Sequence, residues 1–170
     1  MFSKETYIRR RAELKTRVGK GIIVFFGNNE APYNYPANSY APMRQDSTFL
    51  YYFGQHRDGL VGVIDIDNDE EWLLGDDIDV EDIVWMGFTP SVSDLAAEVG
   101  VAKTAPLKDH SSVCRCGTAA SATLHFLPPY RHDTKIMIMD LLGIHPSQQK
   151  EAASVDLIQA VVAMRSKKED

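Results

Sequence analysis

The chain has 170 residues and a formal net charge of −6, with 44% hydrophobic and 25% charged residues, an ordinary composition for one globular domain. An acidic chain argues against a nucleic-acid partner, which would require a basic surface. The sequence has no apolar run near the roughly 20 residues of a membrane-spanning helix and no apolar leader after Met1, so we expect a cytoplasmic protein without membrane contact.

The N-terminal segment predicts a helix followed by a buried strand. Over Glu5–Val18 the pattern is amphipathic, with Ile8, Ala12 and Val18 near one face and basic residues over the rest. The glycines after Val18 end this helix. Gly21–Phe26 is a short β-branched and aromatic run, which predicts a strand covered on both sides.

A long loop separates this strand from the next predicted elements. Asn28–Met43 is rich in proline and asparagine, and a loop of this length inside a compact domain tends to be functional or mobile. Thr48–Gly54 predicts a second strand. Leu60–Ile66 and Glu71–Leu74 predict a hairpin joined by a turn at Asp67–Glu70.

The remaining elements are mostly helices. Helices are predicted at Asp79–Met86, Ser91–Val99, Asp133–Leu142 and Ser154–Met164, and a strand at Thr123–Phe126. Strands that alternate with helices indicate an α/β fold, with a sheet flanked by helices on both faces.

The residues by themselves predict no catalytic group. Neither a G-x-S-x-G elbow nor a glycine-rich phosphate loop occurs in the sequence. Cys114 and Cys116 either bind a metal with His110 and His125 or are reduced structural thiols, and zinc-type spacing is missing. The acidic segment Asp76–Asp82 lacks EF-hand spacing, which favours a solvated helix start over a cation site.

One string resembles a known family. The segment Arg44–Gly54, R-Q-D-S-T-F-L-Y-Y-F-G, is similar to the N-terminal domain of Xaa-Pro aminopeptidases (aminopeptidase P), which read approximately Y-R-Q-x-S-x-F-x-Y-x-x-G. The likeness continues in R-R-R-x-x-L at Arg9–Leu14, G-x-x-x-x-F at Gly21–Phe26, and D-I-V-W-M-G at Asp82–Gly87. It ends in R-S-K-K-E-D at Arg165–Asp170, which resembles the opening of the family's catalytic domain.

The resemblance implies a division of labour between two domains. It implies a mixed sheet flanked by helices for residues 1–164, an accessory domain, and the start of a linker at residues 165–170. A C-terminal pita-bread domain would follow, in which two Asp, one His and two Glu hold two divalent ions, commonly manganese, and the enzyme would release the residue that precedes proline. We therefore expect no catalytic or metal-binding residue in this chain, and no activity of the chain alone.

The resemblance also singles out four residues for substrate contact. Trp85 matches an aromatic residue that, in oligomeric members, can reach a neighbouring subunit's active site, where a flat ring can pack on proline; the alternative is burial in its own core. Asn38 matches a position where some members place an Asp near the substrate, and an amide cannot hold a charged amine as a carboxylate does. Arg44 and Asp46 either face the substrate or pin the preceding loop.

Two alternatives remain open on these grounds. Prolidases and creatinases share the two-domain plan, and the same N-terminal fold also occurs without catalysis as a protein-binding module, for example in a histone chaperone. The partners implied by the first interpretation are the chain's own catalytic domain, a peptide substrate and further subunits of a dimer or tetramer.

Overall fold

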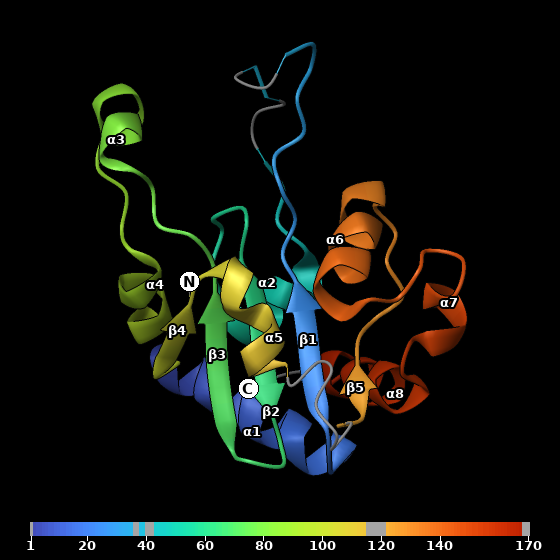
Figure 1. Ribbon diagram of the computed structural model, residues 1–170. Coiled ribbons are helices and arrows are strands. Elements are labelled where there is room, and N and C mark those ends of the chain that lie inside the picture. Colours follow the sequence, from blue (N-terminus) through green and yellow to red (C-terminus); the bar gives the residue numbers. More distant parts are fainter. Residues whose placement is uncertain (1, 36–37, 40–42, 115–121, 168–170) are drawn as a thin grey trace.

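The computed structural model describes residues 2–35, 38–39, 43–114 and 122–167 (Figure 1). Within these residues, no helix has the length and apolarity that crossing a membrane requires. The elements in chain order are α1 (Lys4–Val18), β1 (Ile22–Phe26), α2 (Ser47–Phe53), β2 (Val61–Asp65), β3 (Glu70–Leu74), α3 (Val80–Met86), α4 (Val92–Glu98), β4 (Lys103–Ala105), the 3-10 helix η1 (Leu107–Asp109), α5 (His110–Val113), β5 (Leu124–His125), α6 (His132–Leu142), α7 (Gln149–Ala152) and α8 (Val155–Arg165).

The five strands form one mixed sheet in the order β4-β3-β2-β1-β5. β2 is antiparallel to both β1 and β3, with Val63 opposite Val24 on one side and Trp72 on the other. β4 is parallel to β3, and β5 is parallel to β1. Because β1 and β3 both oppose β2, they run in the same direction, and their carboxyl ends lie at the same edge of the sheet.

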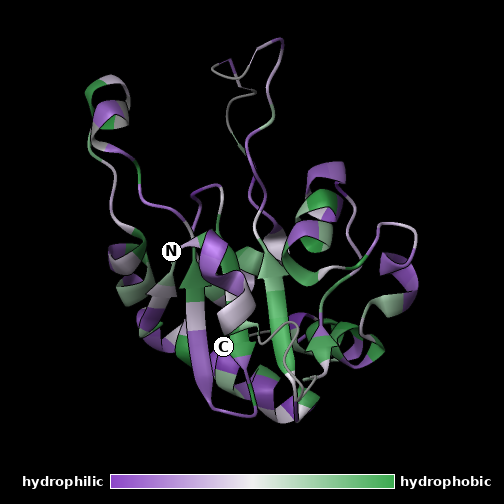
Figure 2. Ribbon diagram, viewed as in Figure 1, coloured by the Kyte–Doolittle hydropathy of each residue, from purple (hydrophilic) through white to green (hydrophobic). Residues whose placement is uncertain are grey.

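Helices cover both faces of the sheet, which confirms the predicted fold class. On one face, buried residues of α1, α2, α4 and α8 pack with Ile23, Phe25 and Ile64. On the other face, residues of α5 and α6 pack with Ile22 and Val24. β1 is hydrophobic along its length (Figure 2), as expected for a strand covered on both sides.

The prediction of a strand at Thr48–Gly54 was wrong, because this segment is the helix α2. Its aromatic residues favour a strand in isolation, but both ends carry helix caps. The Asp46 carboxylate accepts hydrogen bonds from the backbone N–H groups of Thr48 and Phe49 at 2.9 and 2.8 Å. Gly54 ends the helix at φ 64°, a left-handed conformation that glycine adopts without strain.

The first helix occurs as predicted, but it buries a different face. Ile8 is 42% exposed, whereas Arg11 is fully buried. The Arg11 guanidinium donates to the Glu71 carboxylate at 2.7 Å and to the backbone carbonyls of Tyr52 and Val99 at 2.9 and 2.8 Å. A buried charge with this many partners is stable, and apolar periodicity along the helix contains no sign of these distant partners.

Most other predicted elements are confirmed. The hairpin β2–β3 and the helices α3, α4, α6 and α8 lie within two residues of their predicted bounds, and β5 shortens the predicted strand to two residues. Sequence reasoning missed β4, α5 and α7, which are four residues long or shorter. The assignment of residues 165–170 to a linker stays a prediction, because residues 168–170 lie outside the described part of the chain.

Candidate functional site

Two segments project from the same edge of the sheet (Figure 1). One is the loop of residues 27–46 after β1, of which residues 27–35, 38–39 and 43–46 are described, and the other is the segment of residues 75–91 after β3, which carries α3. Their common side follows from the topology, because the carboxyl ends of these two strands share one edge. The candidate site residues Asn38 and Arg44 lie in the first segment, and Trp85 lies in the second.

Trp85 is held in solvent and is no part of the domain's own core. Its side chain is 87% exposed, and its neighbours Val84 and Phe88 are 80% and 85% exposed. Gly87, at φ 81°, turns the chain directly after α3. Exposure of this much apolar surface to water is unfavourable, and burial of the cluster against another surface would be favourable.

Asn38 bonds within its own loop. Its side-chain amide donates to the Asn34 side-chain oxygen at 2.8 Å, and its backbone carbonyl accepts from the Tyr33 N–H at 2.7 Å. The two arms of the loop also pair at an isolated antiparallel bridge between Pro32 and Ser39. The structure therefore gives Asn38 a role in shaping the tip of the loop, and its predicted contact with substrate stays a prediction.

Arg44 lies at the base of the same loop, with an exposed side chain. Its backbone carbonyl accepts a hydrogen bond from the Asn28 side chain at 3.0 Å. The neighbouring Gln45 is buried; its side-chain oxygen accepts from the Asn28 N–H, and its amide donates to the Arg57 carbonyl at 2.8 Å. Gln45 and Asn28 thus pin the loop base and leave the Arg44 guanidinium at the surface.

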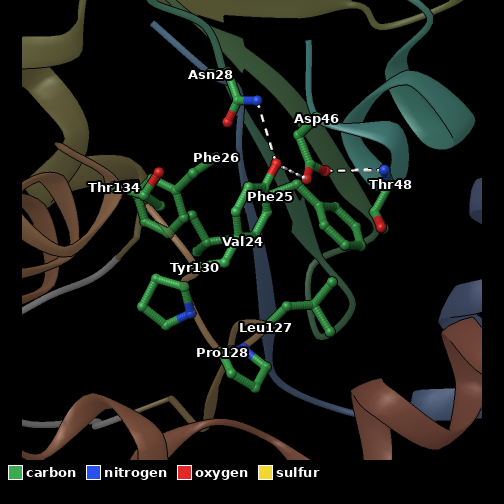
Figure 3. A pocket seen from close by; sticks show the side chains of 11 residues that line it. Val24, Phe25, Phe26, Asn28, Asp46, Thr48, Leu127, Pro128, Tyr130 and Thr134 are labelled. Carbon is green, nitrogen blue, oxygen red and sulfur yellow. Dashed lines mark hydrogen bonds between the residues drawn. The ribbon is translucent and has the colours of Figure 1, made fainter. Parts of the chain in front are cut away.

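Sequence reasoning missed a polar cluster at this base, formed by Asn28, Asp46 and Tyr130. The Tyr130 hydroxyl donates to the Asp46 carboxylate at 3.0 Å and accepts from the Asn28 amide at 3.2 Å (Figure 3). Tyr130 is 68% exposed, but partial desolvation raises the pKa of its hydroxyl, and the carboxylate of Asp46 raises it further, against the opposing effect of the Asn28 hydrogen bond. Asp46 was predicted either to face the substrate or to pin the preceding loop; in the structure it caps α2 and accepts a hydrogen bond from Tyr130, in the segment after β5.

The candidate metal ligands are engaged elsewhere. In the described ranges, no group of three or more His, Cys, Asp or Glu residues is placed to hold a metal ion. Asp76 and Asp77 accept backbone N–H groups of later segments at 3.2 and 2.7 Å. His125 is buried between Ser154 and a backbone carbonyl. Cys114 is buried, and Cys116 lies outside the described residues. The divalent ions implied by the family resemblance therefore find no fitting ligand set in this part of the chain.

The sequence and the structure were compared with known proteins. The family model described as aminopeptidase P, N-terminal domain, matches residues 7–125. A search of curated proteins found no match. Among solved structures, zinc-substituted Escherichia coli aminopeptidase P in complex with product has a TM-score of 0.75 at 18% identity, over 99% of this chain and 40% of that chain. Pseudomonas aeruginosa aminopeptidase PepP has a TM-score of 0.68 at 19% identity, over 90% and 35%, and proline aminopeptidase P II from Yersinia pestis has 0.67 at 16%, over 84% and 33%.

These results confirm the resemblance seen in the Arg44–Gly54 motif. The structural likeness lies below 20% identity in these three cases and therefore shows the fold. The chain spans between 33% and 40% of the length of the solved chains that it matches. Since the family match covers more than half of the sequence, the chain belongs to the aminopeptidase P N-terminal domain family.

Proposed function

We propose that this chain is the accessory domain of a Xaa-Pro metallo-aminopeptidase, and that it narrows the entrance to an active site carried by a catalytic domain. The observation that supports the proposal is the exposed apolar cluster formed by Val84 and Trp85 on α3 and by Phe88 two residues after it, in a segment that projects beyond β3. A side chain as large as Trp that packs on a proline ring excludes water from it.

In this proposal the chemistry belongs to the catalytic domain. Two divalent ions, commonly manganese, would activate a water molecule and polarise the scissile carbonyl there. The domain described here would supply binding surface: Trp85 toward a neighbouring subunit of a dimer or tetramer, and Asn38 and Arg44 toward the peptide. The isolated chain would hydrolyse no Xaa-Pro peptide, with or without manganese.

The test measures hydrolysis of a Xaa-Pro peptide by the protein in which this domain is joined to its catalytic domain. Trp85→Ala should lower kcat/KM about tenfold, the loss of one aromatic packing contact, while the melting temperature stays unchanged, because Trp85 makes little contact within the domain. Trp72→Ala is the matched control. Trp72 is half-buried in the sheet beside Lys103, so its loss should lower stability and leave kcat/KM of the folded enzyme intact.

An unchanged kcat/KM in Trp85→Ala would remove Trp85 from the active-site entrance. Turnover by a clean preparation of residues 1–170 alone would overturn the division of labour. If the longer protein hydrolyses no such peptide and a protein partner binds the α3 cluster, the domain is a binding module instead.

A further inference from the structure

A pocket lies where the chain divides between the two faces of the sheet. β1 and β5 are neighbouring parallel strands. The chain that leaves β1 leads to α2 on one face, and the chain that leaves β5 leads to α6 on the other face. The pocket opens beyond the carboxyl ends of both strands, between Asn28 and the segment of residues 127–130. In open α/β sheets, small ligands bind at such a switch point.

The pocket has the size of one small ring. Its volume is about 170 Å³, close to the apolar cavity of about 150 Å³ that takes up benzene in another protein. Its walls are largely apolar, with Phe26 and Leu127 half-buried and Pro128 at the rim (Figure 3). Thr134, from the first turn of α6, lines a further side. These walls suit a phenyl group or a branched aliphatic group.

One end of the pocket carries the carboxylate of Asp46. One Asp46 oxygen accepts the two N–H groups that it caps in α2, and the other accepts the Tyr130 hydroxyl. No cationic side chain among the described residues forms a salt bridge with Asp46. Each carboxylate oxygen can accept about two hydrogen bonds, so the oxygen toward Tyr130 has capacity for one more donor.

The same geometry selects the chemistry of the ligand. The Tyr130 hydroxyl already donates its proton to Asp46 and accepts a hydrogen bond from the Asn28 amide, so it has no proton to donate to a ligand. A ligand at this end must donate hydrogen bonds, and a positive charge on it would neutralise Asp46. A carboxylate or phosphate would be repelled.

We propose that this pocket binds a primary amine that carries one apolar group of about seven carbons or fewer, with the ring between Phe26 and Leu127 and the ammonium group on Asp46. The ammonium would donate to the Asp46 oxygen that also accepts from Tyr130. This inference does not rest on the peptidase assignment, because the residues that carry it lie within the domain described here. The amine is either a free molecule or the amino terminus of a peptide, which present the same chemistry.

The experiment titrates residues 1–170 with four probes, followed by proton–nitrogen NMR spectra. Benzylamine should shift the amides of Asn28, Tyr130 and Thr134 and reach saturation in the millimolar range. Benzyl alcohol has the same ring without the charge, and benzoate has the opposite charge. Neither should shift these amides to saturation in the millimolar range. Phenylalaninamide that binds more tightly than benzylamine assigns the site to peptide amino termini, and the reverse order assigns it to free amines; both results support the pocket.

Three variants separate the pocket from general charge effects. Asp46→Asn keeps a side-chain oxygen to cap α2 and should weaken benzylamine about tenfold or more, since one charge-assisted hydrogen bond is lost. Asp140→Asn makes the same charge change on an exposed position of α6 and should leave the affinity unchanged. Thr134→Leu should fill the pocket and abolish benzylamine binding. If Asp46→Asn does not fold, this variant alone tests whether benzylamine binds in the pocket. Equal binding of benzylamine and benzyl alcohol, equal affinities of the two Asp variants, or binding that survives Thr134→Leu would each overturn the proposal.

Discussion

Arg11 joins four elements through one buried guanidinium, and its loss should be costly. Arg11→Met keeps most of the side-chain length but removes the donors to Glu71 and to the carbonyls of Tyr52 and Val99. Removing one partner of a buried ion pair costs about 3–5 kcal/mol. Glu71 keeps Lys15 as a second partner at 3.0 Å, so its charge is not left alone. We therefore expect the lower end of this range, about 3 kcal/mol.

The assay is urea and thermal unfolding of the chain. A loss of about 3 kcal/mol corresponds to a fall in melting temperature of about 6–12 °C for a domain of this size. Arg17→Met is the matched control in the same helix. Arg17 pairs with Glu13 at 2.7 Å at the surface, and such a pair contributes about 0.5 kcal/mol or less. If Arg11→Met and Arg17→Met melt at the same temperature, the reasoning from buried hydrogen bonds is refuted.

Two further predictions concern the sheet and an ion pair at the start of α6. Gly62→Ala should destabilise the chain by about 1–3 kcal/mol, because the added methyl group would meet the fully buried ring of Phe53; an unchanged urea midpoint would contradict this. The Arg131 guanidinium holds the pKa of Asp133 below its ordinary value of 3.8, so the pair stabilises the fold above pH 3.8 and this stabilisation is lost as pH falls through the folded-state pKa. Asp133→Asn should therefore be less stable than the parent chain near neutral pH, and this difference should shrink as pH falls below 3.8; a stability difference that does not vary with pH would count against the pair.

The sequence pattern correctly predicted the helices that have strong caps at one end. Ser91 forms a capping box with Asp94, Ser154 accepts from the Leu157 N–H, and Gly143 ends α6 at φ 71°. Each cap involves residues at most three positions from the helix end, so the sequence displays it directly. The cap at Asp46 is equally local, but the prediction of a strand at Thr48–Gly54 rested on the β preference of its residues and did not consider this cap. The helix α2 shows that the cap and the burial of one face decide such a segment.

The residues of the candidate site were likewise found partly from the sequence and partly from the structure. The motif of Arg44–Gly54 was enough to find the family, and Trp85 was found by the same resemblance, but only the structure shows that its ring stands in solvent rather than in the core.

The sequence alone determined the family, the α/β class and the positions of most helices and strands, because these depend on neighbouring residues. The tertiary structure alone decided that Arg11 is buried and that Asn28, Asp46 and Tyr130 meet in one cluster. Asn28 and Tyr130 are far apart along the chain, and they approach one another because β1 and β5, which precede them, lie side by side in the sheet. Strand order is set by the packing of the whole domain, and no local pattern of residues encodes it.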